Sequence, residues 1–304
     1  MEDLIIIGAG PAGLTAGLYA ARARLKVGIL ERLSPGGQVL MTDWVENYPG
    51  FPDGISGFEL MDRMRRQVEK FGLVIENQEV SRLQLSPEKK VVITDKGNLE
   101  SKALILATGA TPQKLGVEGE ELLTGKGISY CATCDGPFFR DQEVAVIGGG
   151  DTAVEEAIFL TRFASKVHQV HRRDELRATK LLRERAMALE KIHFIWDTVV
   201  TRIVGDTEVR GLDLRNVKNG EDSHLPVQGV FIFVGYSPNN ELFRGLLELD
   251  DWGFVVTNND METSIPGVFA AGDIRSKILR QVATAVGEGA TALFAAERYL
   301  ESLE

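Results

Sequence analysis

Residues 4–13 read LIIIGAGPAG, and this stretch decides the fold of the chain. Residues 4–7 form an apolar run too short for a core helix, which predicts a buried parallel strand. The glycine-rich turn leads into residues 14–24, whose alanine-rich pattern predicts a helix. Residues 26–30 predict a second strand, and Glu31 follows it. Strand, glycine turn, helix, strand and acid in this order predict a Rossmann-like α/β unit.

The glycines of this turn have the spacing of a dinucleotide-binding fingerprint. Gly8 permits the tight turn, Gly10 lets backbone approach a pyrophosphate, and Gly13 lets the helix pack close to the strand. The N–H groups and the positive dipole end of the helix favour phosphate. Glu31 is placed to accept hydrogen bonds from an adenosine ribose. The alternative is a glycine-rich turn in an unrelated α/β protein, which would not need this acid.

The same pattern returns 140 positions later without a gap. Residues 144–153 read VAVIGGGDTA, with Gly148 and Gly150 at the first two fingerprint positions and alanine, which the fingerprint allows, at the third. A weaker repeat closes each copy, at residues 108–112 and 234–238, after an apolar strand in both cases. Repeats this long indicate two related nucleotide-binding domains rather than a solenoid.

The two copies differ at the residue after the second strand. Where the first has Glu31, the second has His171, then Arg172 and Arg173, with Arg177 close behind. A carboxylate would repel a 2′-phosphate, whereas guanidinium groups pair with it bidentately. The second unit is therefore predicted to bind NADPH rather than NADH, and the first FAD. The alternative is that these arginines belong to a solvated face of the next helix.

Length and the tail of the chain bear on domain organisation. A chain of 304 residues suggests two domains, at a rough prior of about 150 residues each. The tail from about residue 240 is too short for a third, and predicts a strand at residues 267–271 and a helix at 282–300. The simplest interpretation is that the tail completes the first domain and the second is inserted. Short crossings are expected near residues 113–116 and 237–241.

Composition excludes several classes of protein. The 34 Lys and Arg against 44 Asp and Glu give a net charge of −10, which disfavours a nucleic-acid or anionic-membrane partner. No stretch reaches the 18 apolar residues of a membrane helix, and the N-terminus lacks the features of a signal peptide. The two cysteines are too few for a secreted disulfide scaffold. We therefore expect a cytoplasmic protein.

The two cysteines, Cys131 and Cys134, form a C-x-x-C. One interpretation is that they form half of a zinc site, but the sequence has no second cysteine pair to complete it. A second is a pair of inert buried thiols, and a third is a redox dithiol in which this geometry lowers one thiol pKa. Asp135 is either a proton shuttle for thiol exchange or a turn former beside glycine. We favour the redox dithiol, and local sequence leaves both roles of Asp135 open.

Eight motifs together resemble the bacterial-type, low-molecular-weight thioredoxin reductases, over essentially the full length. They are GAGPAG at 8–13, GGQ at 36–38, VENYPG at 45–50, CATCDG at 131–136, GGGDTA at 148–153, HRRDELR at 171–177, AAGD at 270–273 and RQVATA at 280–285. The resemblance implies a homodimer with one FAD per subunit, FAD-binding residues 1–112 plus 241–304, and an inserted NADPH-binding domain, 113–240, that carries the cysteine pair.

The resemblance also implies roles for individual residues. Electrons would pass from NADPH to FAD, then to a Cys131–Cys134 disulfide, and then to thioredoxin. Cys134 would face the flavin, Cys131 would attack thioredoxin, and Asp135 would be the acid/base. The inserted domain would rotate about its two crossings so that nicotinamide and disulfide reach the flavin in turn.

The cofactor residues implied in this way form two sets, and no metal is expected. Gln38, Thr42 and Asn47 would lie near the isoalloxazine, Asp273 would accept a ribitol hydroxyl, and Arg280, Gln281 and Val282 would line the flavin. The full FAD set is Gly8, Gly10, Pro11, Ala12, Gly13, Glu31, Gly37, Gln38, Thr42, Asn47, Thr108, Gly109, Gly272, Asp273, Arg280, Gln281 and Val282. The NADPH set is Gly148, Gly150, Asp151, Thr152, His171, Arg172, Arg173 and Arg177.

Other functions compete with thioredoxin reduction. A reductase or oxidase of the same fold could act on a glutaredoxin-like protein or a small dithiol, and a flavoprotein redox sensor would bind FAD without turnover. A ferredoxin-dependent relative would lack the arginine set, and a ferredoxin–NADP reductase would lack the cysteine pair. This chain has both.

Overall fold

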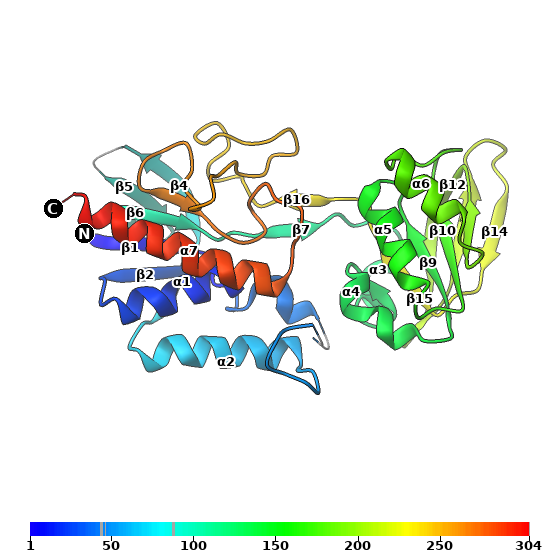
Figure 1. Cartoon of the computed structure of the whole chain (residues 1–304), viewed down its shortest axis with the longest axis horizontal. Helices are drawn as coiled ribbons and strands as arrows, with labels where there is room; N and C mark the ends of the chain where they lie inside the picture. Colours follow the sequence, from blue (N-terminus) through cyan, green and yellow to red (C-terminus); the bar gives the residue numbers. More distant parts are fainter. Residues whose placement is uncertain (43–44, 46, 87–88, 304) are drawn as a thin grey trace. The chain divides into compact units, whose positions relative to one another are not determined.

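The computed structural model describes residues 1–42, 45, 47–86 and 89–303, which form two compact units (Figure 1). The first unit combines Met1–Thr111 with Ser237–Glu304, and the second is Pro112–Tyr236. Glu46 of the VENYPG motif lies outside the described residues. Each unit has its own sheet, and the α/β fold with two Rossmann-like units is confirmed.

The first unit is built on a seven-stranded sheet with the order β3-β2-β1-β6-β5-β4, and β17 pairs with β6. Its parallel strands are β1 (Glu2–Ile7), β2 (Val27–Glu31), β3 (Ile75–Asn77), β6 (Gly97–Leu106) and β17 (Val268–Ala270). The antiparallel part is β4 (Val80–Leu85) and β5 (Lys90–Thr94). The strands expected around residues 4–7 and 26–30 are therefore confirmed, and the tail contributes a strand to this sheet.

Among its described residues, the first unit also has three α-helices and one 3₁₀ helix. They are α1 (Pro11–Arg22), η1 (Gly37–Met41), α2 (Gly57–Lys70) and α7 (Val282–Glu301). Small residues let α1 and α7 pack closely: a Cβ on Gly289 would lie 2.2 Å from the Ala12 carbonyl oxygen. The tail helix is therefore held against the start of α1, beside the first glycine turn.

The second unit has a five-stranded, fully parallel sheet in the order β11-β10-β9-β15-β8. Its strands are β8 (Ile128–Ser129), β9 (Glu143–Ile147), β10 (Lys166–Val170), β11 (Ile192–Ile195) and β15 (Gly229–Ile232). A separate antiparallel sheet contains β12 (Thr198–Gly205), β13 (Val209–Asn216) and β14 (Asp222–Leu225). The helices are α3 (Glu120–Leu123), α4 (Ala132–Asp135), η2 (Gly136–Phe139), α5 (Asp151–Leu160) and α6 (Lys180–Met187).

The two weak repeats of the sequence pair with each other. Strand β7 (Ala110–Pro112) comes from the first and β16 (Tyr236–Pro238) from the second, and they form a two-stranded sheet where the chain passes between the units. Within the described part of the chain, no helix is both long and apolar enough to cross a bilayer.

Candidate functional site

The first glycine turn is sterically tight and leaves its helix terminus open. Gly8 has a φ of 103°, and a Cβ there would lie 2.4 Å from the Ala107 carbonyl oxygen. A Cβ on Gly13 would lie 1.8 Å from the Gly8 carbonyl oxygen. Gly10 is the N-cap of α1, no side chain caps it, and the first turn carries no acidic residue. The N–H groups at this helix end therefore suit a phosphate.

The carboxylate of Glu31 is held by backbone beside this turn. One oxygen accepts a hydrogen bond from the Ala9 N–H at 2.8 Å, and the other from the Leu33 N–H at 2.9 Å. Both bonds leave further lone pairs, because each carboxylate oxygen has two. Glu31 is therefore positioned at the end of β2, where an adenosine ribose would lie in a Rossmann-like unit.

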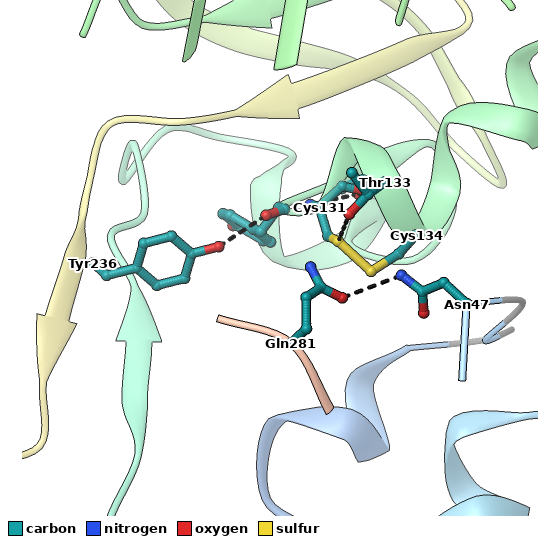
Figure 2. The surroundings of a disulfide bond; sticks show 8 residues. Asn47, Cys131, Thr133, Cys134, Tyr236 and Gln281 are labelled. Carbon is teal, nitrogen blue, oxygen red and sulfur yellow. Dashed lines mark hydrogen bonds between the residues drawn. A yellow bond between two sulfur atoms is a disulfide. The ribbon is translucent and has the colours of Figure 1, made fainter. Parts of the chain in front are cut away.

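Several residues of the implied FAD set meet although they are far apart in the sequence. The Asn47 side-chain amide donates to Gln281 Oε1 at 3.1 Å across 234 positions (Figure 2). Gln281 is the N-cap of α7 and Val282 its first residue. Gln38 lies in η1, and Thr42 ends it. The structure thus brings the VENYPG and RQVATA motifs together.

Thr108 and Gly109 are held by the chain returning after β16. Thr108 Oγ1 donates to the Asn239 carbonyl at 2.8 Å, and the Asn239 side chain donates back to the Thr108 carbonyl at 2.8 Å. The Asn239 N–H donates to the Gly109 carbonyl at 3.1 Å. Reciprocal bonds of this kind fix the turn that follows β6.

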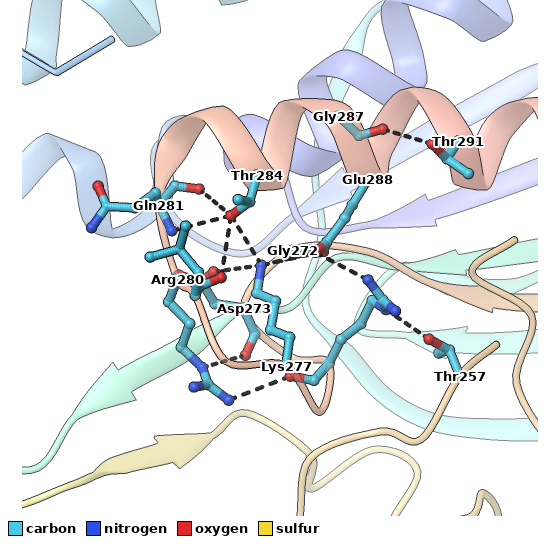
Figure 3. Close-up of polar contacts among 12 residues, drawn as sticks. Thr257, Gly272, Asp273, Lys277, Arg280, Gln281, Thr284, Gly287, Glu288 and Thr291 are labelled. Carbon is cyan, nitrogen blue, oxygen red and sulfur yellow. Dashed lines mark hydrogen bonds and ion pairs between the residues drawn. The ribbon is translucent and has the colours of Figure 1, made fainter. Parts of the chain in front are cut away.

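A charge network supports Gly272 and Asp273 (Figure 3). Glu288 of α7 accepts a hydrogen bond from the Gly272 N–H at 2.7 Å, and forms ion pairs with Arg275 at 3.0 Å and Lys277 at 3.2 Å. Lys277 also pairs with Asp273 at 3.1 Å. The Lys277 and Glu288 side chains are only 9% and 13% exposed, so the network is largely desolvated.

Neither the motifs nor the family resemblance points to Glu288 or Lys277. The signal in the sequence is that Glu288 stands between two glycines in the alanine-rich first part of α7. Arg280, which was identified, donates to the Asp273 and Arg275 carbonyls and lies 4.0 Å from the Phe254 ring centroid. Its guanidinium is thus oriented by cation–π contact and backbone acceptors.

The second glycine turn has the same design with more room. Gly148 has a φ of 145°, and a Cβ there would lie 2.4 Å from the Phe233 carbonyl oxygen. Gly150 is the N-cap of α5, and a Cβ on it would meet no heavy atom within 4 Å. Asp151, whose carboxylate could oppose a phosphate, instead accepts a hydrogen bond from the Thr179 N–H at 2.6 Å. Thr152, the next residue, is exposed.

His171 takes the place of Glu31 in this unit and is buried, 5% exposed. Its ring packs on Gly149, and Nε2 has no hydrogen-bond partner among the described residues. Burial lowers its pKa, and the charges of Arg177, Arg173 and Arg172 lower it further. Positive charge from three solvent-exposed arginines therefore acts on the buried His171 ring. This places positive charge where a 2′-phosphate is expected.

Cys131 and Cys134 form a disulfide (Figure 2). Cys131 is the N-cap of α4, its N–H donates to Ser129 Oγ at 3.0 Å, and its sulfur lies 3.3 Å from Thr133 Oγ1. Asp135 ends α4, and its N–H donates to the Cys131 carbonyl at 3.1 Å. Both cysteines are half-buried, so the disulfide is neither enclosed in the core nor fully exposed to solvent. Within the described ranges, no cluster of three acidic, histidine or cysteine side chains could hold a metal.

Comparison with known proteins agrees with this geometry. A family model described as pyridine nucleotide-disulphide oxidoreductase matches residues 2–289. The chain is 52% identical to a thioredoxin reductase of Mycolicibacterium smegmatis, over 99% of this chain and 97% of the relative, and 51% identical to one of Streptomyces coelicolor, over 100% and 95%. A solved thioredoxin reductase of Streptococcus pyogenes is 50% identical, with a TM-score of 0.94 and 99% of both chains covered.

The chain belongs to the thioredoxin reductase family. The resemblance seen in the motifs is thereby confirmed, and the chain is a flavoprotein disulfide oxidoreductase by membership in this family. The family implies a flavin and a pyridine nucleotide. Both glycine turns fit such groups, because each ends at an uncapped helix N-terminus with an open glycine, Gly10 or Gly150.

Proposed function

We propose that this protein reduces the disulfide of thioredoxin with electrons from NADPH, through FAD and the Cys131–Cys134 disulfide. The observation that carries the proposal is that disulfide, which lies half-buried at the start of α4. The same unit contains the second glycine turn and the three arginines whose charge acts on His171. A dithiol formed there can attack a protein disulfide as a thiolate.

Each glycine turn would hold one dinucleotide. In the first unit, the N-terminus of α1 would bind the FAD pyrophosphate, Glu31 would bind the ribose, and Asp273, supported by Lys277 and Glu288, would bind the ribityl chain. Bound flavin would supply two-electron chemistry. In the second unit, the N-terminus of α5 would bind the NADPH pyrophosphate, and Arg172, Arg173 and Arg177 the 2′-phosphate.

The cysteines would have separate roles. Cys134 would take electrons from the flavin side, and the Cys131 thiolate would attack thioredoxin to form a mixed disulfide. The Cys134 thiolate would then attack Cys131, releasing reduced thioredoxin and restoring the bridge. Asp135 would donate or accept the proton that each exchange requires. The proposal includes a homodimer in the reducing cytoplasm, where disulfides are usually transient and catalytic rather than structural.

An anaerobic assay with matched cysteine variants tests the proposal. Purified holoprotein is mixed with NADPH or NADH and the host's thioredoxin, and thioredoxin thiols are counted. We expect reduction with NADPH in the native protein and at least a 1,000-fold loss in Cys134→Ser and in Cys131→Ser, on the order expected when a covalent catalytic group is removed. Flavin absorbance should be retained in both variants.

Two outcomes would contradict the proposal. Thioredoxin reduction that persists in Cys134→Ser would refute the cysteine roles. Efficient reduction of a glutaredoxin-like protein or a small disulfide, with none of thioredoxin, would assign the enzyme a different dithiol partner.

A further inference from the structure

A carboxylic acid lies behind the disulfide, on the helix that follows the second glycine turn. Glu156 belongs to α5, whose buried residues are Ala153, Val154, Ala157 and Leu160. Residues 153, 156, 157 and 160 share one helical face, so Glu156 occupies a position where an apolar residue is expected. Helix α5 packs against α4, which carries the cysteines. The acid is therefore directed toward the redox helix rather than toward solvent.

The contacts of Glu156 are with the backbone of the C-x-x-C turn. The backbone of Ala132 and Thr133, the first two residues of α4, lies close enough to its carboxylate to lower its pKa by hydrogen bonding. Its Oε2 is buried and has no partner among the described residues. Cys131 is the N-cap of the same helix. The carboxylate therefore uses the N–H groups that would otherwise stabilise a thiolate at the start of α4.

The protonation of Glu156 changes near neutral pH. Its pKa is raised to about 7, chiefly by burial and also by the charge of Glu155, while hydrogen bonding to the backbone of Ala132 and Thr133 acts in the opposite direction. Other ionisable groups lie on the elements packed against α5. They are Asp135 on α4, Lys180, Arg183, Glu184 and Arg185 on α6, Glu143 on β9, and Lys166 and His168 on β10.

We propose that Glu156 is a positioning residue that couples reduction of the Cys131–Cys134 disulfide to uptake of a proton. Two electrons, from the reduced flavin of the proposed function or from an added dithiol, break the S–S bond, and one proton gives one thiol and one thiolate. The thiolate and the Glu156 carboxylate then compete for the same N–H groups. Glu156 takes a second proton from solvent, which relieves the repulsion between the two charges.

The proposal rests on the redox-active dithiol of the proposed function but is tested without thioredoxin. Holoprotein is reduced with excess dithiothreitol, desalted without oxygen and treated with iodoacetamide from pH 5 to pH 10, and the alkylation rate of each cysteine is followed by mass spectrometry. Glu156→Gln keeps the size and one hydrogen-bond acceptor but cannot ionise. Glu155→Gln is the matched control, because it removes an equal charge one position away on the exposed face of α5 and leaves Glu156 able to ionise.

We expect Glu156→Gln to lower the pKa of the reactive thiol by about one unit, because removing a nearby negative charge stabilises the thiolate. At a pH below that pKa, one unit corresponds to about tenfold faster alkylation, and Glu155→Gln should stay within about twofold of the native rate. The reduction equilibrium with dithiothreitol should also depend less steeply on pH between 6 and 8 in Glu156→Gln.

If Glu156→Gln folds poorly, Glu156→Asp provides a second variant, because it keeps the negative charge but moves it away from the N–H groups. Its alkylation profile should lie between the other two. Profiles of Glu156→Gln and Glu156→Asp that superimpose on the native one would overturn the proposal, as would an equal shift in Glu155→Gln. If the shift appears but thioredoxin is not reduced, only the proposed partner is wrong.

Discussion

The two glycine turns have the same strand–turn–helix geometry but differ in the charge of the residues beside them. In the first, the Glu31 carboxylate accepts hydrogen bonds from the Ala9 and Leu33 N–H groups. In the second, the same place holds a buried His171, which is under the positive charge of three arginines. The turn and the helix terminus bind the part common to all dinucleotides, the pyrophosphate. Discrimination between dinucleotides is therefore expected to depend on the residue after the second strand.

The turns also differ in how much space they leave. A Cβ at Gly13 would lie 1.8 Å from the Gly8 carbonyl oxygen, whereas the second unit carries Ala153 at the equivalent place. The first unit packs α1 against both its strand and α7. The first glycine turn is therefore expected to tolerate an added methyl group less well than the second.

The largest expected effect comes from filling the tight turn. Gly13→Ala should lower the free energy of unfolding by about 3 kcal/mol, the upper end of typical overpacking costs, and should release the flavin. Alanine normally stabilises a helix relative to glycine by about 1 kcal/mol, so a lower free energy of unfolding in Gly13→Ala would be due to the steric clash. Denaturant unfolding and flavin absorbance measure both effects.

The reciprocal variant is the control for that prediction. Ala153→Gly should cost only about 1 kcal/mol, the helix propensity of glycine. If Gly13→Ala retained native flavin content and stability, the steric distinction between the two turns would be wrong.

An intermediate effect is expected from removing the positive charge of the second unit. Arg172→Ala with Arg173→Ala should raise KM for NADPH about 100-fold, since each charge-assisted hydrogen bond contributes roughly 1.5–3 kcal/mol. KM for NADH should change less than about twofold, because NADH has no 2′-phosphate. Steady-state kinetics with both coenzymes provide the measurement.

Arg185→Ala removes one exposed arginine of α6 in the same unit; it serves as the control and should leave both KM values near native. Parallel increases for NADPH and NADH in the double variant would show that Arg172 and Arg173 belong to a solvated face instead.

The smallest expected effect is on the pH dependence of stability. The folded protein holds the pKa of His171 below its usual range, chiefly by burial. The unfolded chain therefore takes up the proton first as pH falls, so this contribution to stability is present above about pH 6.5 and is lost below it. His171→Asn should flatten the decline of Tm between pH 7 and pH 5.

His168, whose pKa burial also lowers, remains in that variant, so part of the acid sensitivity should persist. His193→Asn replaces an exposed histidine of the same unit as a control. An unchanged Tm profile in His171→Asn would show that its burial does not govern acid sensitivity.

Local patterns were enough to predict most of the framework. Short apolar runs predicted β1, β2 and β9, and glycine spacing predicted both turns, because strand burial and turn sterics depend on neighbouring residues in the chain. The resemblance added residues whose meeting is not evident locally, such as Asn47 and Gln281. Neither source identified Glu156, Lys277 or Glu288.

The amino-acid order alone determined the duplicated Rossmann-like units, the exchange of an acid for a basic cluster, and the C-x-x-C. Only the tertiary structure decided that Glu288 and Lys277 support the Asp273 loop, and that Glu156 points at the redox helix. The physical reason is that a charged side chain on a helix is ordinarily solvated. Whether it is buried, and against which N–H groups or ions, depends on the elements that pack over it.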